Sequence, residues 1–504
     1  MPRHVARLVP LLLVALLAPQ LVAGQDGPAP QTSRPNILFC IADDWSFPHA
    51  GAYGDKVVKT PAFDRVAAEG VLFTRAFCAA PSCSPSRAAI LTGQAPHRLE
   101  AGGNLWGFLP AKYPVYPDLL DKAGYHVGFQ GKGWGPGRLV DRPRNPAGTP
   151  AKSFEQFLAA APKGAPFCFW FGGTDPHRPY DLNSGAEAGL DPAKVEVPPY
   201  FPDTPEMRND LLDYYAEVQR FDRLVGEMVA LLERRGQLEH TIVVITSDNG
   251  MPFPRCKANL YDSGSRMPLA VRWGAKVKAA QTVDAFVSLT DLCPTFLEAA
   301  GLRPTPEMTG RSILPLIGVG VDGPDQAADR SRVFIERERH ANVRAGDRSY
   351  PARALREDKF LYVRNLAPDL WPAGDPQTWK AVGPFGDIDP GPTKKLVVSG
   401  REDARFAAQF QLACAKRPAE ELYDLEKDPH QVKNVAADAA YADALQRLRR
   451  ETDEWMKRTN DPRAGAGAGV DAFDQYPYFG GGPDNAMESR PRGQRRGARQ
   501  QPAK

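Results

Sequence analysis

Two unbroken apolar runs, each followed by a pair of oxygen-bearing side chains, constrain the fold of this chain more than any other feature. The first covers residues 36–42 and leads into Asp43-Asp44, and the second covers residues 241–246 and leads into Asp248-Asn249. A continuous apolar run of this length is typical of a strand that is buried on both faces of a parallel sheet. Because helices cover the faces of such a sheet, the two runs predict an α/β domain.

Helical patterns alternate with the apolar runs along the first two thirds of the chain. The clearest helix is expected from about Glu206 to Arg235, where apolar residues recur at steps of three and four. Further elements are expected as strands at 71–77, 125–130 and 166–171 and as helices at 60–69 and 86–92. This alternation predicts a doubly wound α/β domain over residues 35–345.

The pattern changes after this domain. Residues 346–460 are expected to form a smaller α+β subdomain, because strand patterns suited to an antiparallel sheet precede a helical pattern there. The strands are expected within 352–366 and at 421–424, and the helix over 440–457. Residues 461–504 are rich in Gly, Pro and Arg without an apolar period, so we expect a disordered basic tail.

Residues 1–24 have the pattern of a signal peptide. A basic start with Arg3 and Arg7 precedes the apolar segment Leu8–Ala18, and the small residues Val22–Gly24 fit a cleavage site. The apolar segment is shorter than the roughly 20 residues that are needed to span a bilayer. We therefore expect an exported protein without a membrane span.

Charge and cysteine content narrow the class of protein. The formal net charge is +3, but Arg3, Arg7 and six basic residues within 490–504 lie at the two ends of the chain. The body between them is mildly acidic, which does not support a nucleic-acid-binding protein. Seven cysteines are scattered without zinc-finger spacing, and their number leaves the disulfide pairing open.

The polar pairs after the two apolar runs are candidates for a metal site. In open α/β sheets, sites form outside the carboxyl ends of the strands. Three carboxylates and one amide, from Asp43, Asp44, Asp248 and Asn249, would repel each other there unless a cation lay among them. Ligation by oxygen alone suits Ca²⁺ or Mg²⁺ better than Zn²⁺. Each pair taken alone could equally be a turn or a helix cap.

The sequence Cys83-Ser-Pro-Ser-Arg87, followed by Leu-Thr-Gly, resembles the signature of the type I sulfatases. Further segments match that family in its order along the chain, and the resemblance extends from about residue 35 to residue 436. These segments are Asp43-Asp44, Lys132, Asp175-Pro-His177, Asp248-Asn-Gly250 and Lys257. Within the family, the chain is similar to the heparan N-sulfatases. The segments that carry this finer resemblance are Asp248–Pro254, Lys257–Tyr261, Asp175–Arg178 and Tyr350–Arg353.

This resemblance implies an alkaline-phosphatase-like fold with a large mixed sheet, and a hydrolase that acts on a sulfate ester or sulfamate of a sulfated saccharide. It implies that Cys83 is converted to formylglycine by a formylglycine-generating enzyme or an equivalent maturase. The hydrate of that aldehyde would attack sulfur, then release sulfate as the aldehyde forms again. It also implies one Ca²⁺ per chain, with ligands from Asp43, Asp44, Asp248, Asn249 and residue 83.

The same resemblance assigns roles to four more residues. Arg87, one helical turn from residue 83, would hold the nucleophile and complement the anion. Lys132 and Lys257 would bind sulfate oxygens. His177 would protonate the leaving group.

One departure from the family concerns proton removal. Sulfatases often carry Lys-x-His, whereas Trp134 stands in the position of that histidine, and an indole cannot act as a base. Lys132, water assisted by Arg87, or His97 could take this role.

Three more residues are expected to line the substrate pocket: Arg266, His340 and Trp134, whose indole ring is expected to stack on a sugar ring. For Trp134 the alternative is a place in the core, and for Arg266 and His340 it is a structural or surface role.

Two other functions remain open. A phosphonate or phosphodiester hydrolase on the same fold could use the same nucleophile. A non-catalytic protein that binds sulfated glycans could retain the pocket without turnover.

Overall fold

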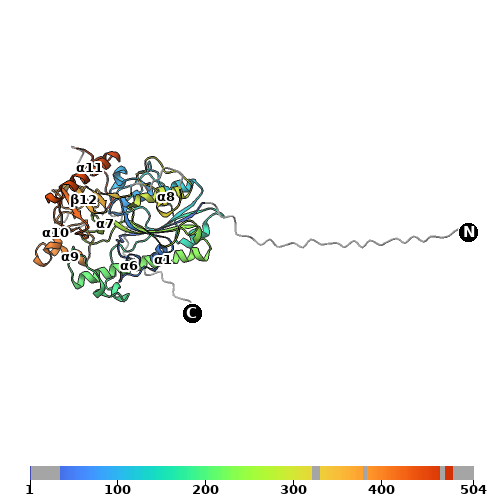
Figure 1. The fold of residues 1–504 in the computed structure, drawn as a ribbon, viewed down its shortest axis with the longest axis horizontal. Helices are drawn as coiled ribbons and strands as arrows, with labels where there is room; N and C mark the ends of the chain where they lie inside the picture. Colours follow the sequence, from blue (N-terminus) through green and yellow to red (C-terminus); the bar gives the residue numbers. More distant parts are fainter. Residues whose placement is uncertain (2–33, 321–329, 378–382, 466–470, 481–504) are drawn as a thin grey trace.

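The computed structural model describes Met1 and residues 34–320, 330–377, 383–465 and 471–480 (Figure 1). These residues form a nine-stranded mixed sheet and a four-stranded antiparallel sheet. None of the helices in these ranges has the length and apolar character needed to cross a membrane. The expected signal peptide, residues 1–24, lies outside the described residues apart from Met1, and so do residues 481–504 of the expected tail.

The large sheet confirms the expected α/β architecture. Its strands run in the order β4-β3-β5-β1-β6-β7-β2-β8, and β9 also pairs with β2. The first five strands in this order are parallel, while β7 is antiparallel to both β6 and β2. The bounds are β1 (Asn36–Ala42), β2 (Val71–Phe77), β3 (His126–Gly131), β4 (Thr149–Pro150), β5 (Phe167–Gly172), β6 (Thr241–Ser247), β7 (Arg266–Arg272), β8 (Gln281–Val283) and β9 (Val287–Ser288).

Helices cover both faces of this sheet. In Figure 1, α1 and α6 lie on one side of the sheet and α8 on the other. The long helix α6 begins with Pro205 after Thr204, whose hydroxyl accepts a hydrogen bond from the backbone N–H of Met207. The bounds are α1 (Pro61–Ala68), α2 (Cys83–Thr92), α3 (Tyr116–Lys122), α4 (Phe154–Ala160), α5 (Ser184–Glu187), α6 (Pro205–Arg234), α7 (Asp262–Ser265) and α8 (Leu292–Ala299).

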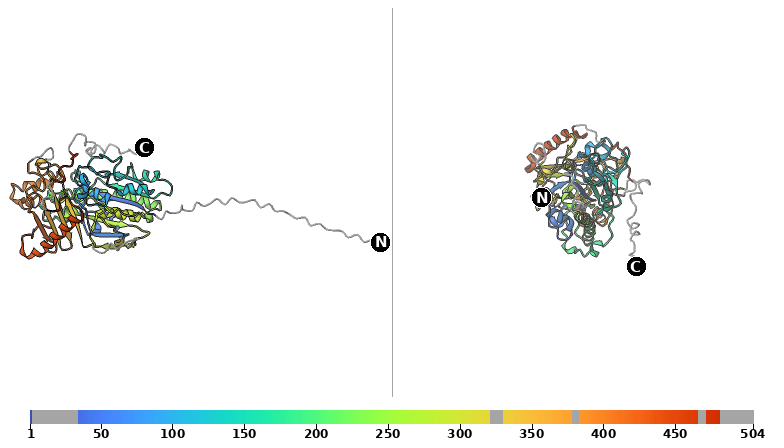
Figure 2. Two further views of the ribbon diagram at one scale, coloured as in Figure 1. Left: turned by 90° about the horizontal axis from the view of Figure 1, so that it is seen from above. Right: turned by 90° about the vertical axis from the view of Figure 1, so that its right-hand side faces the viewer.

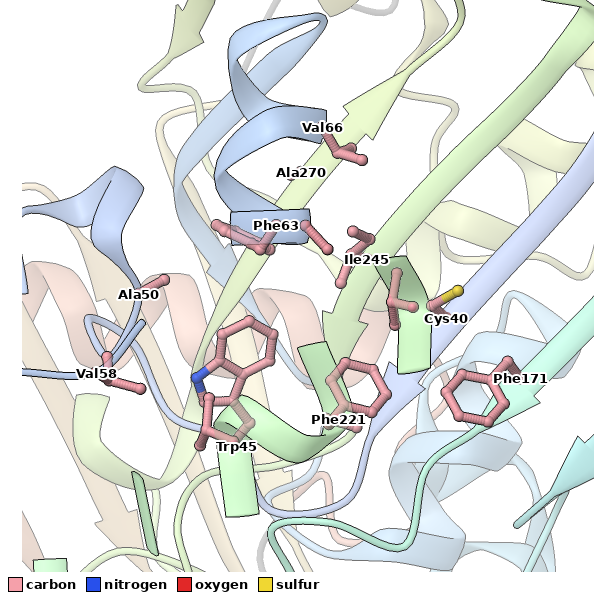
Figure 3. Close-up of a cluster of buried hydrophobic side chains, with 14 of the residues drawn as sticks. Cys40, Trp45, Ala50, Val58, Phe63, Val66, Phe171, Phe221, Ile245 and Ala270 are labelled. Carbon is pink, nitrogen blue, oxygen red and sulfur yellow. The ribbon is translucent and has the colours of Figure 1, made fainter. Parts of the chain in front are cut away.

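Strand β1 shows why an unbroken apolar run is needed at the centre of the sheet. Alternate residues point to opposite faces. Leu38 and Cys40 belong to the cluster packed under α1 and α6, whereas Ile37 and Phe39 belong to the cluster under α8. Figure 3 shows the first cluster, where side chains from the strands meet those of α1 and α6. Both faces of β1 are therefore core.

The second sheet forms the smaller C-terminal part, which lies beside the large sheet (Figure 2). Its strands run in the order β10-β11-β12-β13, and α11 packs against it through Leu448. The bounds are β10 (Arg332–Arg337), β11 (Ala352–Glu357), β12 (Phe360–Asn365), α9 (Pro392–Ser399), α10 (Ala407–Ala413), β13 (Glu420–Asp424) and α11 (Ala442–Arg458). The expected boundary at residue 345 is wrong, because β10 pairs with β11 and so belongs to this sheet.

The expected start of a disordered tail at residue 461 is also wrong. Asp461 is buried and lies 2.6 Å from the Nε atom of Arg353. Phe473 is 1% exposed, and its carbonyl accepts a hydrogen bond from the Asn104 side chain. The backbone N–H of Phe479 donates to the carbonyl of Trp106. This segment is held by single anchors rather than by a periodic apolar face, so its composition gave no sign that it packs.

Candidate active site

Four neighbouring parallel strands end at one edge of the large sheet and place the expected site residues there. Lys132 follows β3, His177 lies shortly after β5, Asp43 follows β1 and Asp248 follows β6. Backbone hydrogen bonds tie these ends together: Lys132 N–H to Gly172 O, Asp43 N–H to Asp175 O, and Asp248 N–H to Ala42 O. Residues more than 200 positions apart in sequence therefore meet at the place where α/β sheets form sites.

Cys83 is the first residue of α2 and faces this edge. Its Sγ atom lies 3.5 Å from Oδ1 of Asp43, and the residue is 2% exposed. Burial raises the pKa of the Cys83 thiol well above its usual range, although Lys132 and Lys257 oppose this shift. A thiol that stays protonated is a weak nucleophile. Cys83 is thus well placed for chemistry but poorly suited to it as an unmodified cysteine.

Arg87 lies one turn further along α2 and is completely buried. Its Nε atom donates to Oδ2 of Asp248 at 2.7 Å, and Nη1 donates to the carbonyl oxygens of Lys132 and Gly133 at 2.8 and 3.1 Å. The guanidinium therefore joins α2 to the ends of β3 and β6. It also neutralises one carboxylate of the acidic group.

Two lysines flank the acidic group. Nζ of Lys132 lies 2.8 Å from both carboxylate oxygens of Asp43, and Nζ of Lys257 lies 2.8 Å from Oδ2 of Asp44. Burial acts to lower the pKa of each lysine, but the neighbouring carboxylates outweigh it, and both pKa values are raised. Both ammonium groups are charged at neutral pH and can bind an anion beside Cys83.

Asp43, Asp44 and Asn249 offer oxygens that fit a hard cation, whereas both carboxylate oxygens of Asp248 accept hydrogen bonds within the protein. The carboxylates of Asp43 and Asp44 and Sγ of Cys83 have ligand atoms within 4.8 Å of one another. Oδ1 of Asn249 is buried and has no hydrogen-bond partner among the described residues, while its Nδ2 donates to Asp44 at 2.6 Å. An unpartnered buried oxygen beside carboxylates is the kind of atom that a bound cation would satisfy.

Asp44 has an unusual backbone conformation and a raised side-chain pKa. Its φ angle of 77° is rare for a residue other than glycine, and its N–H donates to Oδ1 of Asp248 at 3.1 Å. Burial, with the neighbouring Asp43 and Asp248, raises the pKa of Asp44 to about 6 despite the opposing effect of Lys257. A cation among these carboxylates would relieve their repulsion.

His177 reaches the same group from the segment after β5. Its Nδ1 atom lies 2.6 Å from the carbonyl oxygen of Arg178 and therefore donates to it. Nε2 is thus left toward the site, 3.8 Å from Oδ2 of Asp44, and the side chain is 35% exposed. The structure accordingly brings all five expected catalytic residues together at one sheet edge.

Of the residues expected to line the substrate pocket, His340 lies near Cys83 and Arg266 does not. His340 lies beside the nucleophile helix, with Nδ1 2.8 Å from Oγ of Ser82, and burial lowers the pKa of His340 to about 4. Arg266 is not brought into the group, because its guanidinium donates to the carbonyl of Thr74 and stacks on Phe47. The expectation for Arg266 is therefore not supported.

Trp134 and His97 are structural in this fold. Trp134 is 5% exposed and belongs to the core under α8, so the expected stacking on a sugar is wrong and the core alternative holds. His97 is buried under α11, with Nδ1 2.7 Å from Glu336 and its ring against Trp455. His97 therefore cannot serve as the base at residue 83.

Sequence reasoning missed Asp389, which enters the site from the segment between β12 and α9. Its Oδ2 atom lies 3.2 Å from Nζ of Lys257, and its carboxylate groups with Asp44 and His177 within 4.8 Å. The segment has no recognisable motif, and only the short pattern Asp387-Ile-Asp389 marks it as polar. Its position depends on contacts with residues far away in sequence.

Comparison with known proteins agrees with this geometry. The sulfatase family model matches residues 35–135 and 149–302, and the model described as "N-sulphoglucosamine sulphohydrolase, C-terminal" matches residues 256–363. The chain is 31% identical to the N-sulphoglucosamine sulphohydrolase of Homo sapiens over 499 residues, which cover 87% of this chain and 93% of that protein.

Solved structures share the fold at lower identity. One, a complex with D-glucosamine-2-N,6-O-disulfate, has a TM-score of 0.60 and 19% identity, and the match covers 86% of this chain and 99% of that one. The phosphonate monoester hydrolase of Agrobacterium radiobacter has a TM-score of 0.57 and 19% identity, with 85% and 97% covered. At this identity these two structures establish the fold alone. Together with the family-model matches and the human relative, the site places this chain in the sulfatase family.

Proposed function

We propose that this chain is an exported sulfatase that hydrolyses the sulfamate of an N-sulfated glucosamine at the end of a saccharide. The observation that carries the proposal is the position of Cys83 at the start of α2, between the half-buried Lys132, the buried Lys257 and a group of carboxylates. The match to the N-sulphoglucosamine sulphohydrolase model and to the human relative of that name supports the choice of sugar and bond.

The proposal includes conversion of Cys83 to formylglycine by a maturase of the exporting cell. The Cys-Ser-Pro-Ser-Arg sequence and the raised pKa of the thiol support this conversion. The hydrated aldehyde supplies an oxygen nucleophile in place of a protonated thiol. The basic and apolar pattern of residues 1–24 supports export.

It also includes one Ca²⁺, held by Asp43, Asp44, Asp248, Asn249 and residue 83. When bound, this ion supplies positive charge that makes the nucleophile more acidic and offsets the charge of the sulfate. The unpartnered Asn249 oxygen and the crowded carboxylates support this assignment.

Side chains of the protein would bind the sulfate and transfer the protons. Lys132 and Lys257 hold the sulfate oxygens and stabilise the charge that develops on them. His177 gives a proton from Nε2 to the leaving nitrogen, since its Nδ1 is fixed on a backbone carbonyl. Of the three candidates for the proton acceptor in sulfate release, His97 is excluded by its place under α11, which leaves Lys132 and water near Arg87.

A phosphonate hydrolase is the second candidate, because one such enzyme shares the fold at a TM-score of 0.57. Release of sulfate from N-sulfoglucosamine, glucosamine 6-sulfate and 4-nitrophenyl sulfate should be measured beside hydrolysis of a phenyl phosphonate. The protein should be co-expressed with a maturase, and Cys83→Ala is the control. We expect the highest kcat/KM with N-sulfoglucosamine and loss of activity on removal of Ca²⁺ by a chelator. Preference for the phosphonate would overturn the proposal, and binding without turnover of any substrate would favour a glycan-binding protein.

A further inference from the structure

We propose that Asp389 makes this site selective for sulfate carried on nitrogen over sulfate carried on oxygen. This inference rests on the proposed function and names a residue that determines its specificity. The carboxylate belongs to the segment between β12 and α9, which neither family-model match reaches, since they end at residues 302 and 363.

Asp389 lies beside His177, on the side of the site where the leaving group is proposed to take its proton. Its carboxylate lies in one group with Asp44 and His177, the residue proposed to protonate the leaving nitrogen. One oxygen, Oδ2, faces Nζ of Lys257 at 3.2 Å. The side chain is 23% exposed, so part of it reaches solvent.

Hydrogen bonds of Asp387 and Ile388 fix the chain immediately before Asp389. Asp387, two residues earlier, accepts hydrogen bonds from Arg337 at 2.6 Å and from Arg344 at 2.5 Å. Its other oxygen accepts the backbone N–H of Ala341, next to His340. Nζ of Lys394 donates to the carbonyl of Ile388. The backbone before Asp389 is therefore tied to the end of β10 and to the connection between β10 and β11.

Contacts on the other side tie the segment to the residue after His177. Arg178 forms two hydrogen bonds with Asp210 of α6, at 2.8 and 2.7 Å. Thr393 donates to the same Asp210 through its backbone N–H and its hydroxyl. A Cβ atom at Gly391 would lie 2.6 Å from the Arg178 guanidinium, so the chain passes close to it. The carboxylate of Asp389 and the imidazole of His177 are thus held in a fixed relation.

The chemistry of the leaving group explains why a carboxylate here would discriminate. In sulfamate hydrolysis the S–N bond breaks, its electron pair stays on nitrogen, and that nitrogen takes a proton from His177 while a new S–O bond forms. The departing amine carries N–H groups and gains a second proton from water to become an ammonium ion. A fixed carboxylate stabilises such a group through a charge-assisted hydrogen bond. An alcohol leaving from an O-sulfate stays neutral and gains less.

A simpler role for Asp389 would be to hold Lys257 in place. Lys257 also has Asp44 as a partner, at 2.8 Å, so it does not depend on Asp389 alone. The two roles predict different results. Loss of Lys257 positioning would lower kcat/KM by the same factor for every sulfated substrate, because all of them present the same sulfate group. Loss of amine recognition would lower kcat/KM for the N-sulfated substrate more than for the O-sulfated substrates.

The test is Asp389→Asn, compared with the wild type and with Asp369→Asn, the same change at an exposed position of the same segment. kcat/KM should be measured for N-sulfoglucosamine, glucosamine 6-sulfate and 4-nitrophenyl sulfate. We expect Asp389→Asn to lower kcat/KM for N-sulfoglucosamine about tenfold or more beyond its effect on the two O-sulfates. Asp369→Asn should leave all three values unchanged. An equal fall on all substrates would overturn the inference.

A second measurement does not depend on conversion of Cys83. Binding of glucosamine and of glucose, which differ only at the amine, should be measured by calorimetry with unmodified protein. We expect the wild type to bind glucosamine more tightly than glucose. In Asp389→Asn the ratio of the two Kd values should fall by about tenfold. An unchanged preference would contradict the inference. If the wild type releases sulfate from the O-sulfates but not from N-sulfoglucosamine, the proposed function itself fails, and this is seen before any variant is made.

Discussion

The two walls of the site are built in different ways. The strand-end wall consists of Asp43, Asp44, Lys132, Asp248 and Asn249, which follow parallel strands joined by backbone hydrogen bonds, and of Cys83 at the start of α2. The closing wall consists of His340 and Asp389, which lie in loops held by side-chain pairs such as those of Asp387 with Arg337 and Arg344. The strand-end wall is fixed by the sheet itself, whereas the closing wall depends on pairs of residues that are distant in sequence.

This difference assigns different tasks to the two walls. Under the proposed function, the strand-end wall carries the nucleophile, the cation-binding oxygens and one sulfate-binding lysine, so it supports the reaction itself. Under the same proposal, the closing wall faces the part of the substrate that leaves. Changes in the first wall should therefore abolish turnover, and changes in the second should alter which substrate is turned over.

Cys83→Ala should have the largest effect, because it removes the nucleophile from the strand-end wall. We expect kcat to fall by about 10⁴-fold or more for every sulfated substrate. The fold should persist, since Cys83 lies at the first turn of α2 and the Arg87–Asp248 pair is retained. Sulfate release and thermal unfolding check both statements. Substantial turnover by this variant would show that another residue is the nucleophile.

Truncation should separate the packed part of the C-terminal segment from the rest. A chain that ends at residue 460 lacks Asp461 and leaves the buried Arg353 without its 2.6 Å partner. We expect a loss of stability of at least about 3 kcal/mol for this chain. A chain that ends at residue 480 keeps Asp461 and Phe473, and its urea unfolding midpoint should equal that of the full-length chain. Urea unfolding of the three proteins is the measurement, and equal midpoints for all three would contradict the packing seen here.

Asp387→Asn tests the closing wall without touching the site. The change removes the charge that Arg337 and Arg344 share, while an amide oxygen can still accept the N–H of Ala341. We expect a loss of about 1–3 kcal/mol of stability and a lower preference for N-sulfoglucosamine over 4-nitrophenyl sulfate. Conversion of Cys83 should be unaffected. A variant with unchanged selectivity would show that the wall does not need this anchor.

Trp134→Phe should have the smallest effect. The indole Nε1 is buried and has no hydrogen-bond partner among the described residues, so phenylalanine loses packing but no hydrogen bond. We expect a loss of about 1 kcal/mol of stability and equal, small changes in KM for a sulfated saccharide and for an aryl sulfate. A rise in KM confined to the saccharide would restore the sugar-stacking role that burial of the ring contradicts.

The strand-end wall could be predicted from the sequence because each of its parts has a local signal. The apolar runs of β1 and β6 predict strands buried on both faces, and the polar pairs that follow them must meet at one sheet edge. The spacing of Cys83 and Arg87 places both on one side of α2. Each of these inferences needs only neighbouring residues and the geometry of parallel sheets.

The closing wall and the packed end of the chain could not be predicted in the same way. Asp389 owes its position to Arg178, Asp210 and Asp387, which are joined in space by side chains and not by any sequence period. Phe473 is a single anchor in a Gly-rich segment. Trp134 was misassigned for a related reason, since a large aromatic residue between glycines suits a pocket and a core equally well.

The chemical state of residue 83 decides whether formylglycine is the nucleophile. Protein that releases sulfate from N-sulfoglucosamine should be digested, and the peptide containing residue 83 examined by mass spectrometry. We expect an aldehyde in place of the thiol, and a specific activity that rises in proportion to the converted fraction across preparations made with different amounts of maturase. Full activity in a preparation whose residue 83 is entirely unmodified cysteine would contradict this expectation.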